Sequence, residues 1–417
     1  MAKKTKNLHL EHIEDLMLMY GEDGVTQSFD YIDDLVSTFS SNPKNSRQYS
    51  TKWDGAPAIF VGYDPADKQY FVAKKGLFNT TPVLFKSHKE IDDGEKRADL
   101  NKVYHYVFTY MKPLFDSGKL SDVVQGDFLF HDGGGKNGRK KVKDVHNEDC
   151  IIFGPQLIQY CIPDHDDLYD AAANCKLCLV IHAKYPIANA KTVEDLSVEF
   201  GFDASHLSTK DTLILSPFTS ELGSSMVITE SEKQKLKSWK TTARRLLPQC
   251  KTFLNTIAPS HSDPWGMAYF IKQFYNSKVR EGTQVNSASK FYDEYCKYWE
   301  SKYRKKYESL VQAPKIAEWK RKMYVGMDLL EANKKQFIAM VALYNTIQNI
   351  KNIFVPKLES GERFRAYYYD EKTGTYEIGN QEGYVAIRES DKAVKLVQRL
   401  GGFSERNFNA IKQWAKK

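Results

Sequence analysis

The feature that most constrains this chain is a change of pattern that occurs twice. Between residues 50 and 185, short apolar runs rich in β-branched and aromatic residues alternate with polar turns, which is typical of strands. Between residues 230 and 355, glycine and proline become sparse and apolar residues recur at helical spacing. Strand-like runs then return in RFRAYYYDEKTGTYEIG, EGYVAIRES and AVKLVQR. This order predicts an α+β domain that is interrupted by a large helical insert.

The same patterns predict the boundaries of these parts. We expect one run of strand over residues 48–63, joined to a second by a DPADK turn, and an N-terminal helix that ends at Gly21 and Gly24. Residues 316–353 read as one long helix, and a final amphipathic helix begins at Ser404. The predicted parts are an N-terminal helical segment (1–48), the first part of the α+β domain (49–228), the helical insert (229–355) and the second part of the α+β domain with its C-terminal helix (356–417).

Length and composition exclude several classes of protein. The chain has 417 residues, of which 41% are hydrophobic, so it can bury full cores. No run approaches the ~18 apolar residues that a membrane span needs, and the first residues hold no apolar signal core. The six cysteines are dispersed, which suits reduced thiols. We expect a cytoplasmic protein that does not enter a membrane.

Charge is distributed unevenly along the chain. Residues 231–352 hold 23 Lys and Arg against 10 Asp and Glu, a net of +13, whereas the remainder has a net of −6. This separation favours a polyanion partner such as nucleic acid, although exposed lysine-rich helix faces would give the same count. Aromatic residues are interleaved with these cations, and we expect many of them to lie in the helical core instead. The cations that we expect to bind nucleic acid are Lys302, Arg304, Lys305, Lys306, Lys320 and Arg321.

The sharpest chemical signal is the sequence Lys52-Trp53-Asp54-Gly55. A lysine at the end of a strand, followed by a carboxylate and a glycine, suits an amine nucleophile. Because lysine attacks only when neutral, we expect partial burial or nearby cations to lower its pKa from ~10.4. Gly55 would let the backbone turn tightly beside a phosphate. The pattern alone also fits an ordinary surface lysine.

Three later segments follow this lysine in order. Asp127 lies in VVQGDFLFH, Glu382 begins EGYV, and Lys395 lies in AVKLVQR. Together with Lys52 they resemble the ordered motifs of the covalent nucleotidyltransferases, the superfamily of ATP-dependent DNA ligases, RNA ligases and mRNA-capping enzymes. The resemblance covers about residues 45–185 and 360–400. It implies a nucleotidyltransferase domain, of the ATP-grasp-like ligase adenylation type, that carries N-terminal helices and the insert.

The resemblance also implies roles for these residues. Lys52 would be adenylylated on Nζ by ATP, and Lys395 would contact the α-phosphate. Glu382 and Asp127 would hold Mg²⁺, although family members more often have Glu at the position of Asp127. The catalytic pair would be Lys52 and Lys395, and the nucleotide-binding set would be Lys52, Asp54, Gly55, Lys75, Asp127, Glu382 and Lys395.

The chain departs from the family pattern in three further places. Pro57 replaces an arginine that duplex-DNA ligases commonly have, and Lys395 is followed by Leu396 and Val397 rather than by a K-x-K motif. About 20 residues follow that motif, too few for an OB-fold. The aromatic that stacks on adenine aligns with either Phe153 or His182, and both remain open.

These observations lead us to expect an ATP-dependent polynucleotide ligase. We expect a phage-type, monomeric enzyme of DNA repair or replication that seals nicked duplex DNA and tolerates RNA–DNA hybrids, because K-x-D-G is the DNA-ligase form and the insert could encircle a duplex. An RNA ligase is the alternative, because the OB-fold and the arginine are missing, and a capping enzyme fits less well. A module that binds nucleic acid without activity is a further alternative.

Overall fold

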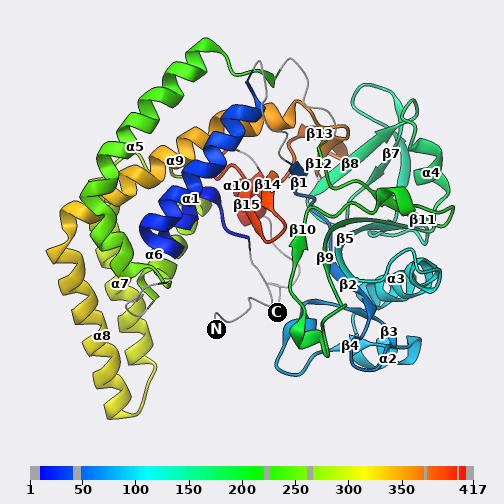
Figure 1. Ribbon diagram of the computed structural model, residues 1–417, viewed down its shortest axis with the longest axis horizontal. Coiled ribbons are helices and arrows are strands. Elements are labelled where there is room, and N and C mark those ends of the chain that lie inside the picture. The colour runs from blue at the N-terminus through cyan, green and yellow to red at the C-terminus, as the bar shows by residue number, and fades with distance from the viewer. Residues whose placement is uncertain are drawn as a thin grey trace. The chain divides into compact units, whose positions relative to one another are not determined.

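The computed structural model describes residues 10–40, 48–219, 226–260, 266–370, 373–401 and 403–409. Their mixture of helices and mainly antiparallel sheets confirms the α+β class. The chain divides into two compact units, shown in Figure 1. Unit 1 comprises Met1–Leu10, Arg47–Leu222 and Leu358–Val394, and unit 2 comprises Glu11–Ser46, Gly223–Lys357 and Lys395–Lys417.

A mixed sheet forms the largest part of unit 1. Its described strands follow the order β10-β9-β5-β2-β3-β4, and β11 pairs with β9 in parallel. Helix α3 contacts β2, β3, β5 and β9 on one face, with α2 beside it (Figure 1). The bounds are β2 Ala58–Tyr63, β3 Tyr70–Ala73, β4 Leu84–Phe85, β5 Val123–His131, β9 Leu177–Tyr185, β10 Glu199–Phe200, β11 Thr212–Leu215, α2 His88–Gly94 and α3 Ala98–Asp116.

Alternation along the strands explains why both faces of this sheet are covered. In β2, Ile59 and Val61 lie in one buried cluster with Val107 of α3. Phe60 lies in a second cluster, with Phe71. Because successive strand residues point to opposite faces, an uninterrupted apolar run predicts a strand that is buried on both sides.

Two smaller sheets complete unit 1. One has the order β13-β12-β8-β7-β6 and the other β1-β14-β15. The bounds are β1 Gln48–Thr51, β6 Lys140–Lys143, β7 Asp149–Phe153, β8 Ile158–Pro163, β12 Arg365–Asp370, β13 Thr375–Gly379, β14 Tyr384–Glu389, β15 Lys392–Leu396 and the short helix α4 Tyr169–Asn174.

The predicted run of strand over residues 48–63 is wrong in one respect. It is two strands, β1 and β2, which belong to different sheets. Pro57 has no N–H for a sheet ladder, and residues 52–57 between the two strands belong to neither sheet. The predicted hairpin after it is confirmed, because β2 and β3 pair from Phe60↔Ala73 to Tyr63↔Tyr70. The break places Lys52 at the end of the first strand.

Unit 2 is built from helices. Within the described residues its bounds are α1 Leu16–Thr38, α5 Glu230–Ile257, α6 Met267–Arg280, α7 Ala288–Glu308, α8 Ala313–Ala332, α9 Lys334–Glu359 and α10 Phe403–Asn409, with the last two residues of α9 assigned to unit 1. Gly21 has φ 63° and interrupts α1, as the sequence predicted. The helix predicted over residues 316–353 is two helices, α8 and α9, separated at Asn333. The later part of the predicted C-terminal helix, from residue 410 on, lies outside the described residues.

The unit boundaries differ from the predicted ones, because the N-terminal helix and the residues after Val394 group with the insert. A buried ionic cluster within unit 2 gives the physical reason. Lys351 Nζ lies 2.7 Å from Glu14 Oε1, and both side chains are fully buried. Arg399 reaches the same oxygen at 2.9 Å and contacts Asp15 at 2.8 Å. Buried charges need such partners, so the 3₁₀ turn Ile13–Asp15, which directly precedes α1, is held to α9 and to the segment around Arg399.

The acidic α1 also neutralises part of the basic insert. Lys240 of α5 forms an ion pair with Asp33, and Lys251 lies 3.8 Å from Glu22. The net charge of +13 that was counted over residues 231–352 is therefore not all available to a partner. None of the helices in the described ranges combines the length and apolar character that crossing a membrane requires.

Candidate active site around Lys52

The pairing of β1 with β14 brings the segments of Lys52 and Glu382 together. Thr51 is opposite Tyr384, and the Lys52 backbone N–H donates to the Gly383 carbonyl over 2.8 Å. Lys52 follows one strand directly and Glu382 precedes the other, so the two side chains meet. Lys52 Nζ lies 2.5 Å from Glu382 Oε1, and both side chains are partly exposed. Gly383 has φ 146°, a conformation that favours glycine.

The expected lowering of the Lys52 pKa is not what the structure gives. Burial by itself would lower the pKa of Lys52, but the charge and hydrogen bond of Glu382 outweigh burial and raise it above the ordinary value. Asp127 and Asp54 act in the same direction. Sequence reasoning looked for cations near the lysine, whereas the fold surrounds it with carboxylates. In this state Lys52 is an ammonium ion, and it must lose a proton before it can attack.

Asp54 holds the chain after Lys52 against the five-stranded sheet. Its Oδ2 accepts the N–H groups of Leu157 and Ile158 at 2.8 and 3.0 Å, and its own N–H donates to the Tyr160 hydroxyl at 2.6 Å. Burial and the neighbouring Glu382 raise the pKa of Asp54 to about 6, although the two N–H bonds and Lys52 oppose the rise. Asp54 therefore fixes the position of Lys52 through the backbone.

Gly55 is required by a close approach to β5, in addition to any role beside a phosphate. A Cβ at this position would lie 2.6 Å from Asp127 Cβ and 2.8 Å from the Phe128 carbonyl oxygen. The Ala56 N–H donates to the same carbonyl at 3.0 Å. This contact places Asp127, which pairs opposite Ala58, beside the Lys52 turn.

Asp127 has a partner that sequence reasoning did not assign to it. His182 of β9 places Nε2 3.4 Å from Asp127 Oδ2, and about a quarter of the His182 side chain is exposed. The other candidate for stacking on adenine, Phe153, is only 1% exposed and packs against Phe130 and Tyr160. Only His182 of these two therefore presents a ring face that a ligand could reach.

The register of the large sheet gives the place of Lys75. Ala73 pairs with Phe60, so the residues after Ala73 lie at the same end of the sheet as Ala58, the partner of Asp127. Lys74 is bound to Glu95 at 3.2 Å. Lys75 is exposed, and no side-chain contact is recorded for it among the described residues. Of Lys74 and Lys75, it is therefore Lys75 that is available to bind an anionic ligand at this edge of the sheet.

A pair of half-buried carboxyls next to this site was not found from the sequence. Thr51 donates its hydroxyl to Glu362 Oε1 at 2.7 Å, and the Tyr384 hydroxyl donates to Glu359 Oε2 at 3.1 Å. Burial raises the pKa of Glu362 to about 7, with Glu359 adding to the rise, and burial also raises the pKa of Glu359. These acids precede β12 by only a few residues, and only their burial distinguishes them from surface glutamates.

Within the predicted nucleotide-binding set, Lys395 is the member that belongs to unit 2. Its backbone N–H donates to the Glu11 carbonyl at 2.8 Å. Together with burial and other cations, it helps to lower the pKa of His12. The Lys52 cluster described above is built without it.

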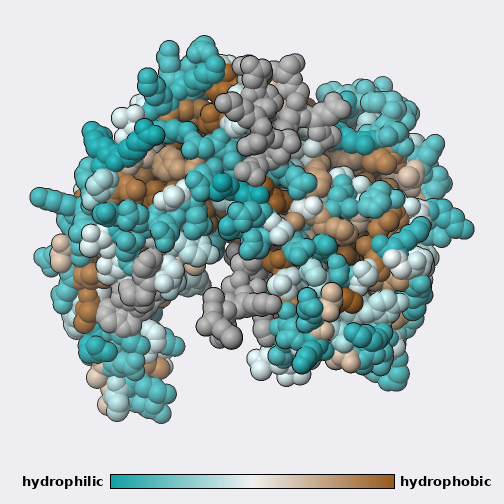
Figure 2. Space-filling view, in the orientation of Figure 1, coloured by the Kyte–Doolittle hydropathy of each residue, from teal (hydrophilic) through white to brown (hydrophobic). Residues whose placement is uncertain are grey.

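The cations expected to bind nucleic acid lie on the hairpin of α7 and α8. Lys302, Lys306 and Lys320 lie over the rings of Tyr298, Trp319 and Tyr307, respectively. Arg304 pairs with Glu300, whereas Lys305 and Arg321 are exposed and have no recorded side-chain contact in the described part. Figure 2 shows that hydrophilic residues cover most of the visible face at the free end of this hairpin.

Most aromatic residues of the insert are structural. Tyr295 and Trp299 are fully buried, and Tyr303 is 1% exposed. Tyr324 is 61% exposed, so it lies on the surface.

Comparison with known families finds a match over residues 7–412. The chain belongs to DUF6267, a family of unknown function. No curated protein and no solved structure matches the chain. Because the function of DUF6267 is unknown, a proposed function for this chain has to be argued from the geometry of the site.

Proposed function

We propose that this DUF6267 protein is an ATP-dependent polynucleotide ligase that works through a lysyl-AMP intermediate on Lys52. The observation that carries the proposal is the 2.5 Å contact between Lys52 Nζ and Glu382 Oε1 at the ends of paired strands, with Asp127 and Asp54 close enough to affect the Lys52 pKa. The backbone beside Lys52 is also bound to two different sheets, through Gly383 on one side and Asp54 on the other, and an ordinary surface lysine does not need such support.

The chemistry follows from the position of the amine. Lys52 first gives up a proton, for which Glu382 Oε1 is the nearest acceptor. The neutral amine then attacks the α-phosphorus of ATP, so that an N–P bond forms and the P–O bond to pyrophosphate breaks. AMP passes to a 5′-phosphate on the polynucleotide. A 3′-hydroxyl then attacks that phosphate, which forms the phosphodiester bond and releases AMP.

The donor set fits a magnesium ion that is shared with a substrate rather than held by the protein alone. No group of three or more carboxylate, imidazole or thiol side chains that could hold a metal is found in the described part of the chain. Mg²⁺ commonly uses one or two carboxylates together with substrate phosphates, and Glu382 and Asp127 would supply these. The ion, when bound, would offset negative charge on the phosphoryl oxygens. Lys75 and His182 would contact the nucleotide, and the α7–α8 hairpin would bind the polynucleotide backbone.

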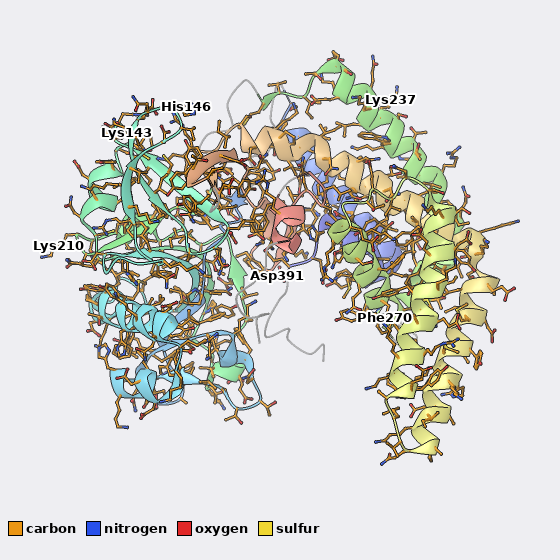
Figure 3. All side chains as sticks on the ribbon, turned by 180° about the vertical axis from the view of Figure 1, so that it is seen from behind. Lys143, His146, Lys210, Lys237, Phe270 and Asp391 are labelled. Atoms are coloured by element: carbon orange, nitrogen blue, oxygen red, sulfur yellow. The ribbon has the colours of Figure 1, made fainter. Side chains whose placement is uncertain are left out.

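Covalent labelling tests the proposal directly. The protein is incubated with α-labelled ATP and Mg²⁺, denatured, and examined for label on the chain and for the modified residue. We expect label on Lys52, its loss in Lys52→Ala, and its retention in Lys210→Ala. Lys210 is a matched control, because it is an exposed lysine of the same unit that extends from the surface in Figure 3.

Glu382→Gln separates charge from shape in the same assay. It keeps the size of the side chain and removes the carboxylate, so we expect slower labelling and a higher Mg²⁺ requirement. Wild-type labelling by Lys52→Ala would refute the proposal. Complete absence of label in the wild type would favour a module that only binds nucleic acid, and label from GTP alone would favour a capping enzyme. Sealing of nicked RNA but not nicked DNA would favour the RNA ligase.

A further inference from the structure

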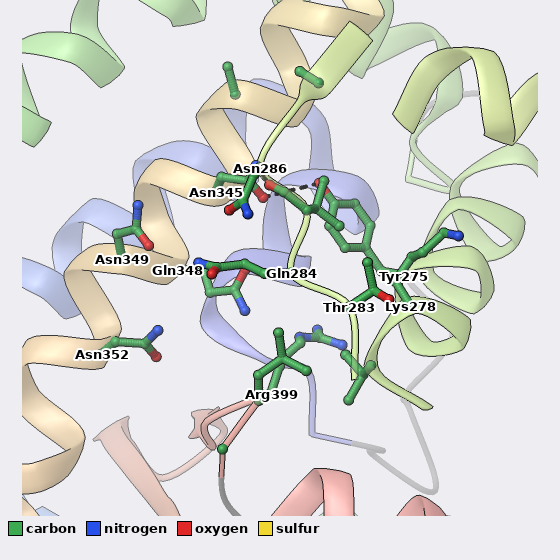
Figure 4. Close-up of a pocket in the computed structure, with 16 residues that line it drawn as sticks. Tyr275, Lys278, Thr283, Gln284, Asn286, Asn345, Gln348, Asn349, Asn352 and Arg399 are labelled. Atoms are coloured by element: carbon green, nitrogen blue, oxygen red, sulfur yellow. Dashed lines mark hydrogen bonds between the residues drawn. The ribbon is translucent and has the colours of Figure 1, made fainter. Parts of the chain in front are cut away.

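Unit 2 contains a cavity of about 600 Å³ that none of the proposed steps uses. Its walls come from the end of α6, the segment 283–286, the face of α9 and the residues around Arg399 (Figure 4). Ligand sites in proteins commonly have volumes of about 300–1,000 Å³, so the cavity has a suitable size.

Side-chain amides dominate the polar lining of this cavity. Asn345, Gln348, Asn349 and Asn352 recur along α9 at helical spacing, which places them on one face. Gln348 and Asn352 extend from α9 toward the 283–286 segment in Figure 4. That segment contributes two more amides, Gln284 and Asn286. We call these six residues the amide cluster.

Four members of the amide cluster, Gln284, Asn286, Asn349 and Asn352, are exposed to solvent. Asn345 donates to the Val285 carbonyl at 2.9 Å and accepts from the Tyr275 hydroxyl at 3.4 Å. For the other five amides, no side-chain hydrogen bond is recorded in the described ranges of the chain. Gln348 is half-buried on the cavity wall, so its donors and acceptors face the cavity with only water to satisfy them.

The cations that line the cavity are already neutralised. Lys278 lies 3.0 Å from both Glu281 and Glu294. Arg399 is held by Glu14 and Asp15 in the buried cluster. Among the described residues that line the cavity there is no carboxylate. An anion would therefore find no spare cation, a cation would find no counter-charge, and an apolar ligand would leave the amides unsatisfied.

A neutral, planar ligand with both donors and acceptors meets these conditions. Asn and Gln side chains carry both kinds of group, and they pair in a bidentate manner with base edges, most characteristically with adenine. We propose that the amide cluster binds unpaired bases of the polynucleotide, while the α7–α8 hairpin of the same unit contacts its phosphates. This division corresponds to the usual one, in which phosphate contacts position the chain and base contacts discriminate. The inference rests on the proposed polynucleotide substrate.

Binding without ATP tests this inference separately from catalysis. The affinity of the full chain is measured by fluorescence anisotropy for a single-stranded adenine-rich oligonucleotide and for an abasic strand of equal length, across a salt series. The variants are Gln348→Ala with Asn352→Ala, and Asn349→Ala as a milder second change. Gln234→Ala is the matched control, because Gln234 is an exposed amide on α5 without a recorded side-chain contact.

We expect the wild type to bind the base-containing strand more tightly than the abasic strand. The double variant should lose about tenfold in affinity for the former and little for the latter, with no change in salt slope, because no phosphate contact is removed. Equal binding of the two strands by the wild type, or an unchanged affinity of the double variant, would overturn the inference. The inference would also be overturned if a neutral sugar, but not adenosine, competed with the oligonucleotide for binding.

Failure of this inference and failure of the proposed function are distinguishable. ATP-dependent labelling of Lys52 with no preference for base-containing strands refutes only the amide cluster. Base-dependent binding that disappears in the double variant, without any labelling, refutes only the ligase reaction.

Discussion

The half-buried Glu362 provides a quantitative prediction about stability and pH. Its pKa rises from the ordinary 4.5 to about 7, because burial disfavours the charged form and Glu359 adds to the rise. Between these two values the folded chain binds a proton that the unfolded chain releases. The free energy of unfolding of unit 1 should therefore fall as the pH rises from about 4.5 to about 7.

The magnitude follows from the size of the shift. At about 1.36 kcal/mol for each pH unit, a rise from 4.5 to about 7 corresponds to roughly 3 kcal/mol. Glu362→Gln keeps the shape and an oxygen for the Thr51 hydroxyl but cannot ionise. We expect the variant and the wild type to have similar pH dependence below pH 4.5. Above pH 7 the variant should gain stability relative to the wild type, by up to roughly 3 kcal/mol.

Fluorine NMR of protein labelled with 5-fluorotryptophan can measure this unit separately. Trp53 is the only tryptophan in the segments assigned to unit 1, and Trp53→Phe assigns its resonance. Urea titrations from pH 4 to pH 8 then give the unfolding free energy of the unit. Asp54, whose pKa is about 6, will leave a residual slope in the variant. The exposed Asp391→Asn is the control (Figure 3). An equal pH slope in Glu362→Gln and the wild type would refute the reasoning.

Two further predictions concern packing and charge. Gly55→Ala should destabilise unit 1 by about 1–3 kcal/mol, because its Cβ would meet atoms of β5 at 2.6 and 2.8 Å. Gly76→Ala is the control, because its Cβ would meet no atom closer than 3.4 Å, and it should change the stability by less than about 0.5 kcal/mol. Equal urea stability of the two variants would contradict this. Replacing Lys305 and Arg321 by Ala should make the log–log salt dependence of DNA binding shallower by about 1.8, at 0.9 for each phosphate contact, and Lys210→Ala should leave it unchanged. An unaltered slope in the double variant, measured by anisotropy between 50 and 200 mM salt, would place the phosphate contacts elsewhere.

The sequence by itself determined the features that depend on neighbours along the chain. Strand alternation around Phe60, the break at Gly21 and the hairpin between β2 and β3 are local, because each depends on the conformation of a few successive residues. The α+β class followed from the same patterns. The order of the motif residues could also be read from the sequence, since Lys52 and Glu382 each lie beside a strand-like apolar run.

The tertiary structure determined the ion pairs, the burial and therefore the pKa values of these residues. Lys52 and Glu382 are 330 positions apart in the chain, and the pairing of β1 with β14 brings them together. The resulting ion pair raises the pKa of Lys52, which the sequence alone suggested would be lowered. The acidic α1 neutralised lysines of α5 that are more than 200 positions away in the chain, so counted charge overstated the available charge. Glu362 gained its raised pKa from burial and from the nearby Glu359, both of which depend on the fold. Electrostatic energies depend on distance and solvent access in three dimensions, and neither quantity is encoded in the spacing of residues along the chain.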